Sequence, residues 1–204
     1  MISKLRIAAI AIAFALPAQA RDLYPEQLSA DASFVRVLTA TKIQSLALDD
    51  RAIPEHIYGN LSAYYPIEKD NVTLQSDALN QAFSLKAKRF YTIILTASGA
   101  QLLEDPQLQN PNKAMIRFYN LSGLSANITA PDFNTEIFAP VTSGSSAYKE
   151  INALELRAVA QDAQKKTPLA ETKISLQRRI DTSLLLLPKS SGQQLISYNA
   201  KIER

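Results

Sequence analysis

The sequence has no cysteine and no tryptophan, a single histidine, and only five glycines among its 204 residues. Because there is no cysteine, no disulfide can support the fold, and burial of apolar side chains must hold it together alone. A zinc site needs thiolates or several imidazoles, which this composition does not supply. We therefore predict a protein with no metal site and no cofactor.

Residues suited to catalysis are equally scarce. The sequence contains no G-x-S-x-G, H-E-x-x-H, Walker or G-x-G-x-x-G motif. The lone histidine, His56, follows Pro54 in an apparent loop, without a recognisable nucleophile or orienting carboxylate. The acid pairs at 49–50 and 104–105 are sequence neighbours, which face opposite ways on a strand, so we interpret them as turn residues. We predict that the protein is not an enzyme; the alternative is an unusual active site at His56.

The one long apolar run lies at the N-terminus. Residues 7–16 are apolar, Lys4 and Arg6 precede them, and an A-x-A cleavage sequence follows at 18–20. This pattern predicts a signal peptide over residues 1–20, and the run is too short to span a bilayer. Export without cysteine is typical of a bacterial periplasmic protein. Without Lys4 and Arg6 the chain has 20 Lys and Arg against 19 Asp and Glu, so its charge is +1 and a nucleic-acid partner is excluded.

The remaining sequence resembles a tandem repeat. Residues 34–38 (FVRVL) return as 115–119 (MIRFY), and residues 90–95 return as 182–186. Matching positions are 81–83 residues apart up to Leu156 and 91 apart at Leu176, which indicates one insertion, a longer loop at 161–168. The alternative is two unrelated β-domains of similar composition.

Short segments of alternating polarity, separated by turn residues, predict an all-β protein. The fold class expected is two tandem antiparallel β-sandwiches of immunoglobulin or fibronectin type. Residues 21–98 form the first sandwich with an extended lead-in, 99–112 a linker rich in Gly, Pro and acids, and 113–204 the second sandwich. The strands expected in the first sandwich are 33–39, 43–48, 57–60, 63–67, 71–75, 81–85 and 90–97; those in the second are 113–119, 125–129, 135–138, 147–149, 153–160, 171–177, 182–187 and 194–198.

Three clustered tyrosines are candidate binding residues. Tyr58, Tyr64 and Tyr65 lie within eight residues, and a tyrosine ring offers an apolar face with a polar rim suited to a sugar or a partner protein. The alternative is a structural role in the core, favoured by the recurrence of Tyr65 as Tyr148.

A basic stretch is the second candidate. Lys86, Lys88 and Arg89 precede the strand at 90–97, and basic residues at 173, 178 and 179 match them in the second copy. Repeated basic strips on one side are suited to an anionic polymer. The alternative is a solvated strand face that guards a sheet edge.

The first residues after the predicted cleavage site resemble those of a known family. Leu23-Tyr24-x-Glu26, with Pro25 between, precedes the segment 33–37 (SFVRV), and this order is similar to the start of the AlgF family. Length, export signal, absence of cysteine and two β-units extend the resemblance over the mature chain. The resemblance implies a non-catalytic periplasmic accessory of alginate O-acetylation. It implies as partners a membrane-bound O-acyltransferase and periplasmic acetyltransferases of the SGNH-hydrolase type.

This chain lacks the G-D-S segment and the D-x-x-H pair of such acetyltransferases; the residue three before His56 is Ile53. The leading hypothesis is therefore an adaptor that bridges or assists acetyltransferase components. Related proteins also accompany cellulose acetylation, so the polymer stays open. The other hypotheses are a carbohydrate-binding module, with the polysaccharide as ligand, and a structural or chaperone-type sandwich that offers its edge strands to partners.

Overall fold

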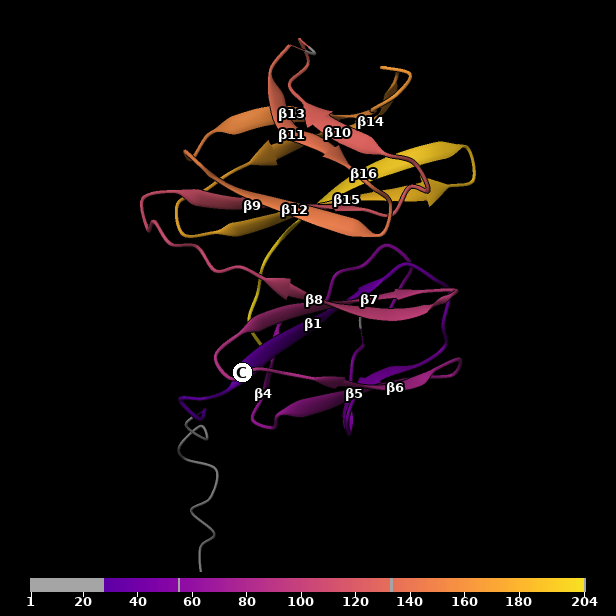
Figure 1. Ribbon diagram of the computed structural model, residues 1–204, viewed down its shortest axis with the longest axis vertical. Coiled ribbons are helices and arrows are strands. Elements are labelled where there is room, and N and C mark those ends of the chain that lie inside the picture. The colour runs from indigo at the N-terminus through magenta and orange to yellow at the C-terminus, as the bar shows by residue number, and fades with distance from the viewer. Residues whose placement is uncertain (1–27, 55, 133, 204) are drawn as a thin grey trace, which may run out of the picture.

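The computed structural model describes residues 28–203 except 55 and 133, and this part of the chain is all-β, with four sheets of four strands and no helix (Figure 1). The predicted signal peptide and residues 21–27 lie outside the described residues. Within them, no helix has the length and apolarity needed to cross a membrane. The strands are β1 (Ser33–Thr39), β2 (Leu46–Leu48), β3 (Arg51–Ala52), β4 (Tyr65–Ile67), β5 (Asn71–Ser76), β6 (Asn80–Ser84), β7 (Phe90–Thr96), β8 (Gly99–Asp105), β9 (Ala114–Asn120), β10 (Ala126–Thr129), β11 (Glu136–Val141), β12 (Ser145–Ile151), β13 (Glu155–Asp162), β14 (Pro168–Ser175), β15 (Asp181–Lys189) and β16 (Gly192–Asn199).

The two halves of the chain have the same strand topology. In the N-half, β1 to β8, the sheets have the orders β4-β1-β7-β8 and β3-β2-β5-β6. In the C-half, β9 to β16, the orders are β12-β9-β15-β16 and β11-β10-β13-β14. Each strand of the N-half thus has its counterpart eight strands later, which accords with the predicted repeat.

The expectation of wholly antiparallel sheets was wrong for one strand pair in each half. β1 pairs with β7 in parallel, and β9 pairs with β15 in parallel. The chain leaves β1, passes through the other sheet twice, and returns to the same sheet in the same direction. This long crossover is what a parallel pair requires, and no hairpin can provide it. Whether the sheets are of immunoglobulin type stays a prediction.

Each half has its own hydrophobic core between its two sheets. In the N-half, Val35 and Ile93 of one sheet share a core with Val72 and Leu74 of the other. The predicted alternation at 71–75 is confirmed, because Val72 and Leu74 are fully buried while Asn71 and Gln75 are exposed. In the C-half, fourteen buried residues, among them Phe118, form the equivalent core.

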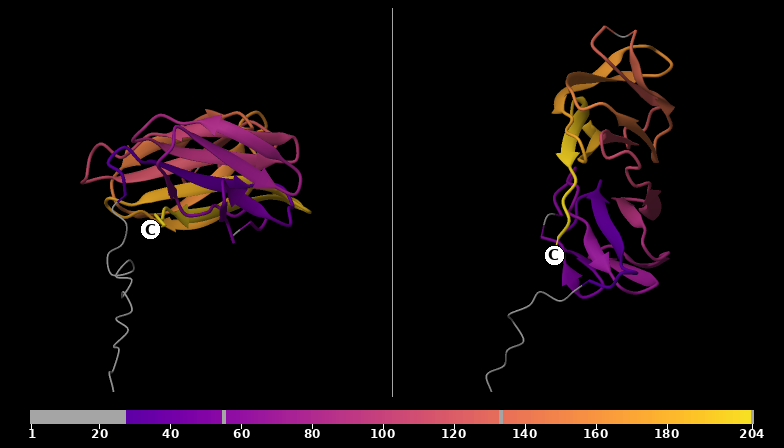
Figure 2. Two further views of the ribbon diagram at one scale, coloured as in Figure 1. Left: turned by 90° about the horizontal axis from the view of Figure 1, so that it is seen from below. Right: turned by 90° about the vertical axis from the view of Figure 1, so that its left-hand side faces the viewer.

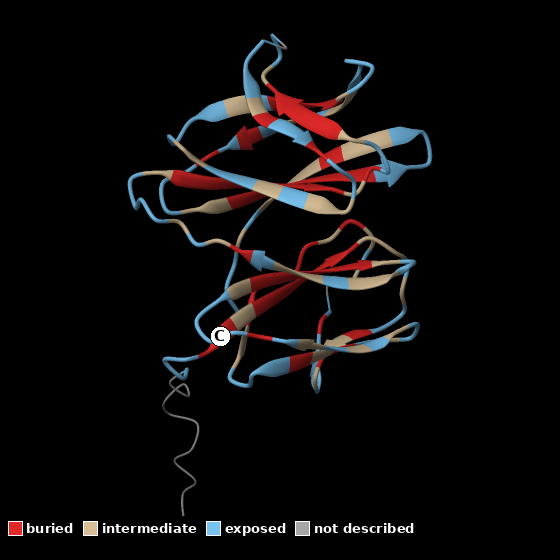
Figure 3. Cartoon of the chain, viewed as in Figure 1, coloured by how far each residue is buried: buried red, intermediate tan, exposed pale blue. Residues whose placement is uncertain are grey.

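A third core joins the halves. Sheet β4-β1-β7-β8 faces sheet β12-β9-β15-β16, so the four sheets stack in four layers, with the buried residues concentrated on the two inner sheets (Figure 3). This interface core consists of Leu38, Leu61, Ile94, Tyr119, Leu185 and Leu187, with further partly buried residues around it. The inner strands β1, β7, β9 and β15 are therefore buried on both faces.

The first half of the predicted linker at 99–112 is a strand. Gly99–Asp105 forms β8, which pairs with β7 along its whole length. Gly99 has φ = +135°, so it forms the turn of the β7–β8 hairpin and does not begin a linker. The connection between the halves starts only at Pro106.

Other boundaries also differ from the prediction. No strand forms at 57–60, and the short β3 was not expected. The expected loop at 161–168 is shorter than predicted and spans 163–167, since β13 extends to Asp162 and β14 begins at Pro168. The chain end after β16 runs back to the N-half, as the right-hand view in Figure 2 shows, and Ile202 forms a bridge with Tyr64 there.

Candidate functional site

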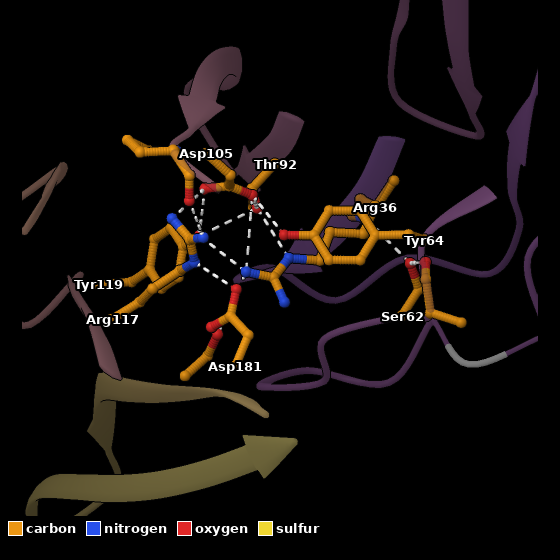
Figure 4. A network of polar contacts seen from close by, with 12 residues as sticks. Arg36, Ser62, Tyr64, Thr92, Asp105, Arg117, Tyr119 and Asp181 are labelled. Carbon is orange, nitrogen blue, oxygen red and sulfur yellow. Dashed lines mark hydrogen bonds and ion pairs between the residues drawn. The ribbon is translucent and has the colours of Figure 1, made fainter. Parts of the chain in front are cut away.

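The repeated arginines of the two FVRVL-like segments meet between the halves. Arg36 lies at the centre of β1, where Val35 and Val37 point into the N-half core. Side chains alternate along a strand, so Arg36 points the other way, toward the C-half. Arg117 lies at the equivalent place in β9 and points toward the N-half (Figure 4).

Two aspartates balance these arginines. Asp105, the last residue of β8, has one carboxylate oxygen 3.5 Å from Arg36 Nη2 and the other 3.7 Å from Arg117 Nη1. Arg117 Nε donates a hydrogen bond of 2.6 Å to Oδ2 of Asp181, the first residue of β15. Arg36 and Asp105 are only 1% and 3% exposed. We call these four residues the Arg–Asp cluster; its net charge is zero.

Hydroxyl groups supply further hydrogen bonds to the cluster, although Arg36 Nη1 and Asp181 Oδ1 have no partner among the described residues. Tyr64 and Tyr119 each donate a hydrogen bond of 2.7 Å to Asp105, and Thr92 donates a third. Arg36 Nη2 donates to the Tyr119 and Ser183 hydroxyls at 2.9 and 3.1 Å. Buried ions persist only when such groups replace the lost water, and here the groups come from both halves.

The cluster sets the protonation states of its members. Burial alone would raise the pKa of Asp105, but Arg36 and Arg117 outweigh it and hold the pKa below its ordinary value. Burial raises the pKa of Tyr119 and of Tyr64, so both phenols keep their protons and act as donors. Asp105 is therefore charged at neutral pH.

Stability should consequently fall in acid. The stabilisation from Asp105 is fully present above the pKa of the unfolded state, near pH 4, and is lost as the pH falls through the lower folded-state pKa. Urea unfolding of the wild type and of Asp105→Asn should show a stability difference that shrinks between about pH 5 and about pH 3. A constant difference over this range would contradict the assignment.

Chemically, the Arg–Asp cluster joins the halves and activates no group. The arginines do not release protons at accessible pH, the tyrosines stay protonated, and the Asp105 oxygens accept bonds from three hydroxyls. His56 is remote from this chemistry: its Nδ1 lies 3.0 Å from the Ile53 carbonyl oxygen. Over residues 28–203, apart from 55 and 133, no group of His, Asp and Glu has the arrangement of a metal site.

The three candidate tyrosines do not form a binding face. Tyr64 is 3% exposed because it belongs to the interface, and Tyr65 is buried in the N-half core. Tyr58 is partly exposed, and its hydroxyl donates to the Pro188 carbonyl across the interface. A stacking surface is therefore wrong for Tyr64 and Tyr65, which have structural roles.

The basic candidates remain on the surface. Lys86, Lys88 and Arg89 are all exposed. Lys88 pairs with Asp31 at 2.9 Å and Arg89 with Glu104 at 3.6 Å, which reduces their local positive charge. Their role in binding an anionic partner stays a prediction.

Sequence reasoning missed the Arg–Asp cluster. Asp105 was interpreted as a turn residue, but it is buried. Two signals pointed to the cluster. A charged residue stands at the centre of an apolar run in both repeats, and the run at 184–187 is apolar at every position, which is typical of a strand buried on both faces.

Comparisons with known proteins agree on one family. A family profile described as "Alginate O-acetyl transferase AlgF" matches residues 4–180. The alginate biosynthesis protein AlgF of Pseudomonas syringae pv. tomato is 28% identical over 155 residues, covering 74% of this chain and 70% of that protein. The AlgF proteins of Pseudomonas putida and Pseudomonas aeruginosa are each 25% identical, covering 71% and 76% of this chain and 68% and 72% of their own.

A solved structure of the C-terminal domain of AlgF from P. aeruginosa is similar at 25% identity over 44% of this chain and 98% of that domain. Its TM-score of 0.35 is too low to support a structural argument. The family profile, however, spans most of the sequence and agrees with the resemblance noted at residues 23–37. The chain belongs to the AlgF family.

Proposed function

We propose that this protein is a non-catalytic periplasmic adaptor in the O-acetylation of an exopolysaccharide, with alginate as the first candidate polymer. It would bridge or assist a membrane-bound O-acyltransferase and SGNH-type acetyltransferases. Membership of the AlgF family and the curated relatives named for alginate biosynthesis support the pathway. The predicted signal peptide supports the compartment. The adaptor would consist of two immunoglobulin-like sandwiches, each exposing sheet edges and loops.

One observation carries the non-catalytic part. The most buried charged side chains that the structure describes, Arg36, Asp105 and Arg117, pair with one another at the junction of the halves. A catalytic site needs such groups poised toward a substrate, with a nucleophile and base in contact. The word transferase in the family description is compatible with an accessory role in transfer. No specific observation favours a carbohydrate-binding module at Tyr58, Tyr64 and Tyr65.

Deletion of the gene should remove acetyl groups from the polymer while leaving polymer yield unchanged. The reason is that an adaptor of acetylation acts after polymerisation. Acetyl content can be measured by NMR of the purified polymer, with complementation by the wild-type gene as control. Unchanged acetylation in the deletion strain would overturn the proposal.

His56→Ala provides the matched test of catalysis. The variant should restore acetylation as fully as the wild type, because the His56 ring is hydrogen-bonded to a backbone carbonyl, that of Ile53, and not to a nucleophile or a carboxylate among the described residues. Purified protein should also release no acetate from an acetyl ester. Loss of complementation by a folded His56→Ala protein would revive an enzymatic role.

A further inference from the structure

β12 is an edge strand with an open side. In sheet β12-β9-β15-β16 it pairs with β9 alone, over all seven of its residues. Its counterpart in the N-half, β4, is also an edge, next to β1. The two edges differ in what lies beside them.

The backbone groups that β12 presents can be assigned from its neighbours. Met115 and Leu121 of the β9 segment donate their amides to Ile180 and Leu186, so the odd-numbered residues of β9 bond to β15. The even-numbered residues of β9 therefore form their backbone hydrogen bonds with β12. Their partners in β12 are Ser145, Ala147, Lys149 and Ile151. The N–H and C=O groups of Ser146, Tyr148 and Glu150 point outward from the sheet.

The N-half shows such an edge in its occupied form. Tyr64 donates its amide to the Lys201 carbonyl at 2.8 Å and accepts a 2.8 Å bond from the Glu203 amide. Tyr64 and Ile202 thus form a parallel bridge. The chain's own C-terminal segment therefore pairs with this edge through one bridge, and Ile202 and Tyr64 line a common cavity.

Tyr148 is the counterpart of Tyr64. Arg36 pairs with Thr92 and Arg117 with Ser183, so the two arginines are equivalent. Arg117 is paired with Tyr148, and the Arg36 guanidinium lies 4.3 Å from the Tyr64 ring centroid. The register therefore equates Tyr148 with Tyr64, one residue from the match to Tyr65 made on sequence.

Tyr64 is bridged on its outer side, whereas no segment among the described residues pairs with Tyr148 on that side. Tyr148 is 56% exposed, against 3% for Tyr64. By the same register, Pro106 after β8 corresponds to Lys201 after β16. The Pro106 carbonyl, however, accepts a hydrogen bond from the Arg117 side chain and not from the Tyr148 amide. The space beside the edge is a cavity of about 220 Å³, lined by Pro106, Ser146, Ala147 and Tyr148 among others.

The first part of the β12 edge also lacks the usual protection of a sheet edge. Sheet edges are usually protected by proline or charged residues. Other edge strands follow this rule, as β11 carries Pro140 and β14 carries Pro168 and Lys173. β12 carries Lys149 and Glu150 near its C-terminal end, but its first four residues, 145–148 (SSAY), include neither a proline nor a charged residue.

We propose that the β12 edge binds an extended segment of a partner protein as an added strand. The segment carries an apolar residue between two polar ones, as Ile202 lies between Lys201 and Glu203. The bridge between Ile202 and Tyr64 argues for a segment of this composition, because it shows what pairs with the equivalent edge. The chain's own C-terminal segment is already bound at Tyr64, so the β12 edge is assigned to a partner protein. The inference rests on the proposed adaptor function and gives it a docking site.

A peptide with the sequence of residues 199–204 (NAKIER) tests the site on the full mature protein. In a titration followed by amide NMR, shifts should be confined to residues 145–151 and the residues lining the cavity, with saturation in the millimolar range, as expected of one short strand. Absence of shifts there, or shifts only at 62–67, would overturn the inference. The titration uses purified protein, whereas the adaptor function is tested by polymer acetylation in the deletion strain. A failed titration would therefore not contradict the adaptor function.

Two matched pairs sharpen the test. Ser146→Pro removes an outward amide that β9 does not use and should weaken binding about tenfold, whereas Ser146→Ala should bind as the wild type does. In case Ser146→Pro fails to fold, the peptide itself can be changed. Methylation of its Glu amide, the counterpart of the Glu203 donor, should abolish binding, and methylation of its Ile amide should not. Equal binding within either pair would contradict an added strand.

Discussion

Replacing Asp105 with asparagine is expected to lower the free energy of unfolding by about 3–5 kcal/mol, the cost of breaking a buried ion pair on one side. The variant leaves Arg36 and Arg117, which are only 1% and 4% exposed, with Asp181 as the one carboxylate of the cluster. An asparagine side chain can still accept a hydrogen bond from a hydroxyl group, so the loss of stability measures the contribution of the carboxylate charge. Urea unfolding at neutral pH measures it.

Glu104→Gln is the matched control. Glu104 precedes Asp105, is exposed, and pairs with Arg89 at 3.6 Å, so its loss should cost about 0–1 kcal/mol. Adding Arg36→Met to Asp105→Asn should recover part of the stability, because it restores a neutral cluster. A cost below about 1 kcal/mol for Asp105→Asn would show that the Arg–Asp cluster does not stabilise the fold.

Replacing Ile94 with aspartate is expected to separate the two halves. Ile94 lies fully buried in the interface core, on the face of β7 opposite the N-half core. A docked variant would bury an unpaired carboxylate, which costs several kcal/mol, while an undocked one exposes it to water. Each half keeps its own core. Small-angle X-ray scattering should therefore show a larger radius of gyration, with an unchanged far-ultraviolet circular dichroism spectrum.

Unfolding should change as well. The wild type should unfold in one transition and Ile94→Asp in two, because the halves no longer stabilise each other. Ile57→Asp is the control: Ile57 is exposed, so the same substitution there should leave the scattering curve and the single transition intact. An Ile94→Asp protein with wild-type scattering would contradict the assignment of this interface core.

The strand positions were largely predictable because local patterns determine them. Alternation at 71–75 and the apolar runs at 33–39 and 90–97 correspond to β5, β1 and β7. The prediction failed at β8, where Gly99 and two acids suggest a loop when taken alone. Asp105 is compatible with a strand only because Arg36 and Arg117 approach it from strands distant in sequence.

Candidate site residues were harder to assign, for the same reason. Tyr58, Tyr64 and Tyr65 have the composition of a binding face, but composition does not say which sheet covers a ring. Tyr64 is covered by the chain's own last residues, and its counterpart Tyr148 is not. The difference lies in the segments that follow β8 and β16.

The sequence by itself determined the all-β class, the doubled pattern of strands and the family, because these depend on local periodicity and on residues close together in the chain. Only the tertiary structure decided that the repeated faces dock on each other, that two equivalent arginines share one aspartate, and that one sheet edge is covered while its counterpart stays open. These features depend on contacts between residues as far apart as Arg36 and Ser183. Such contacts form from the packing of whole sheets, which no short stretch of sequence encodes.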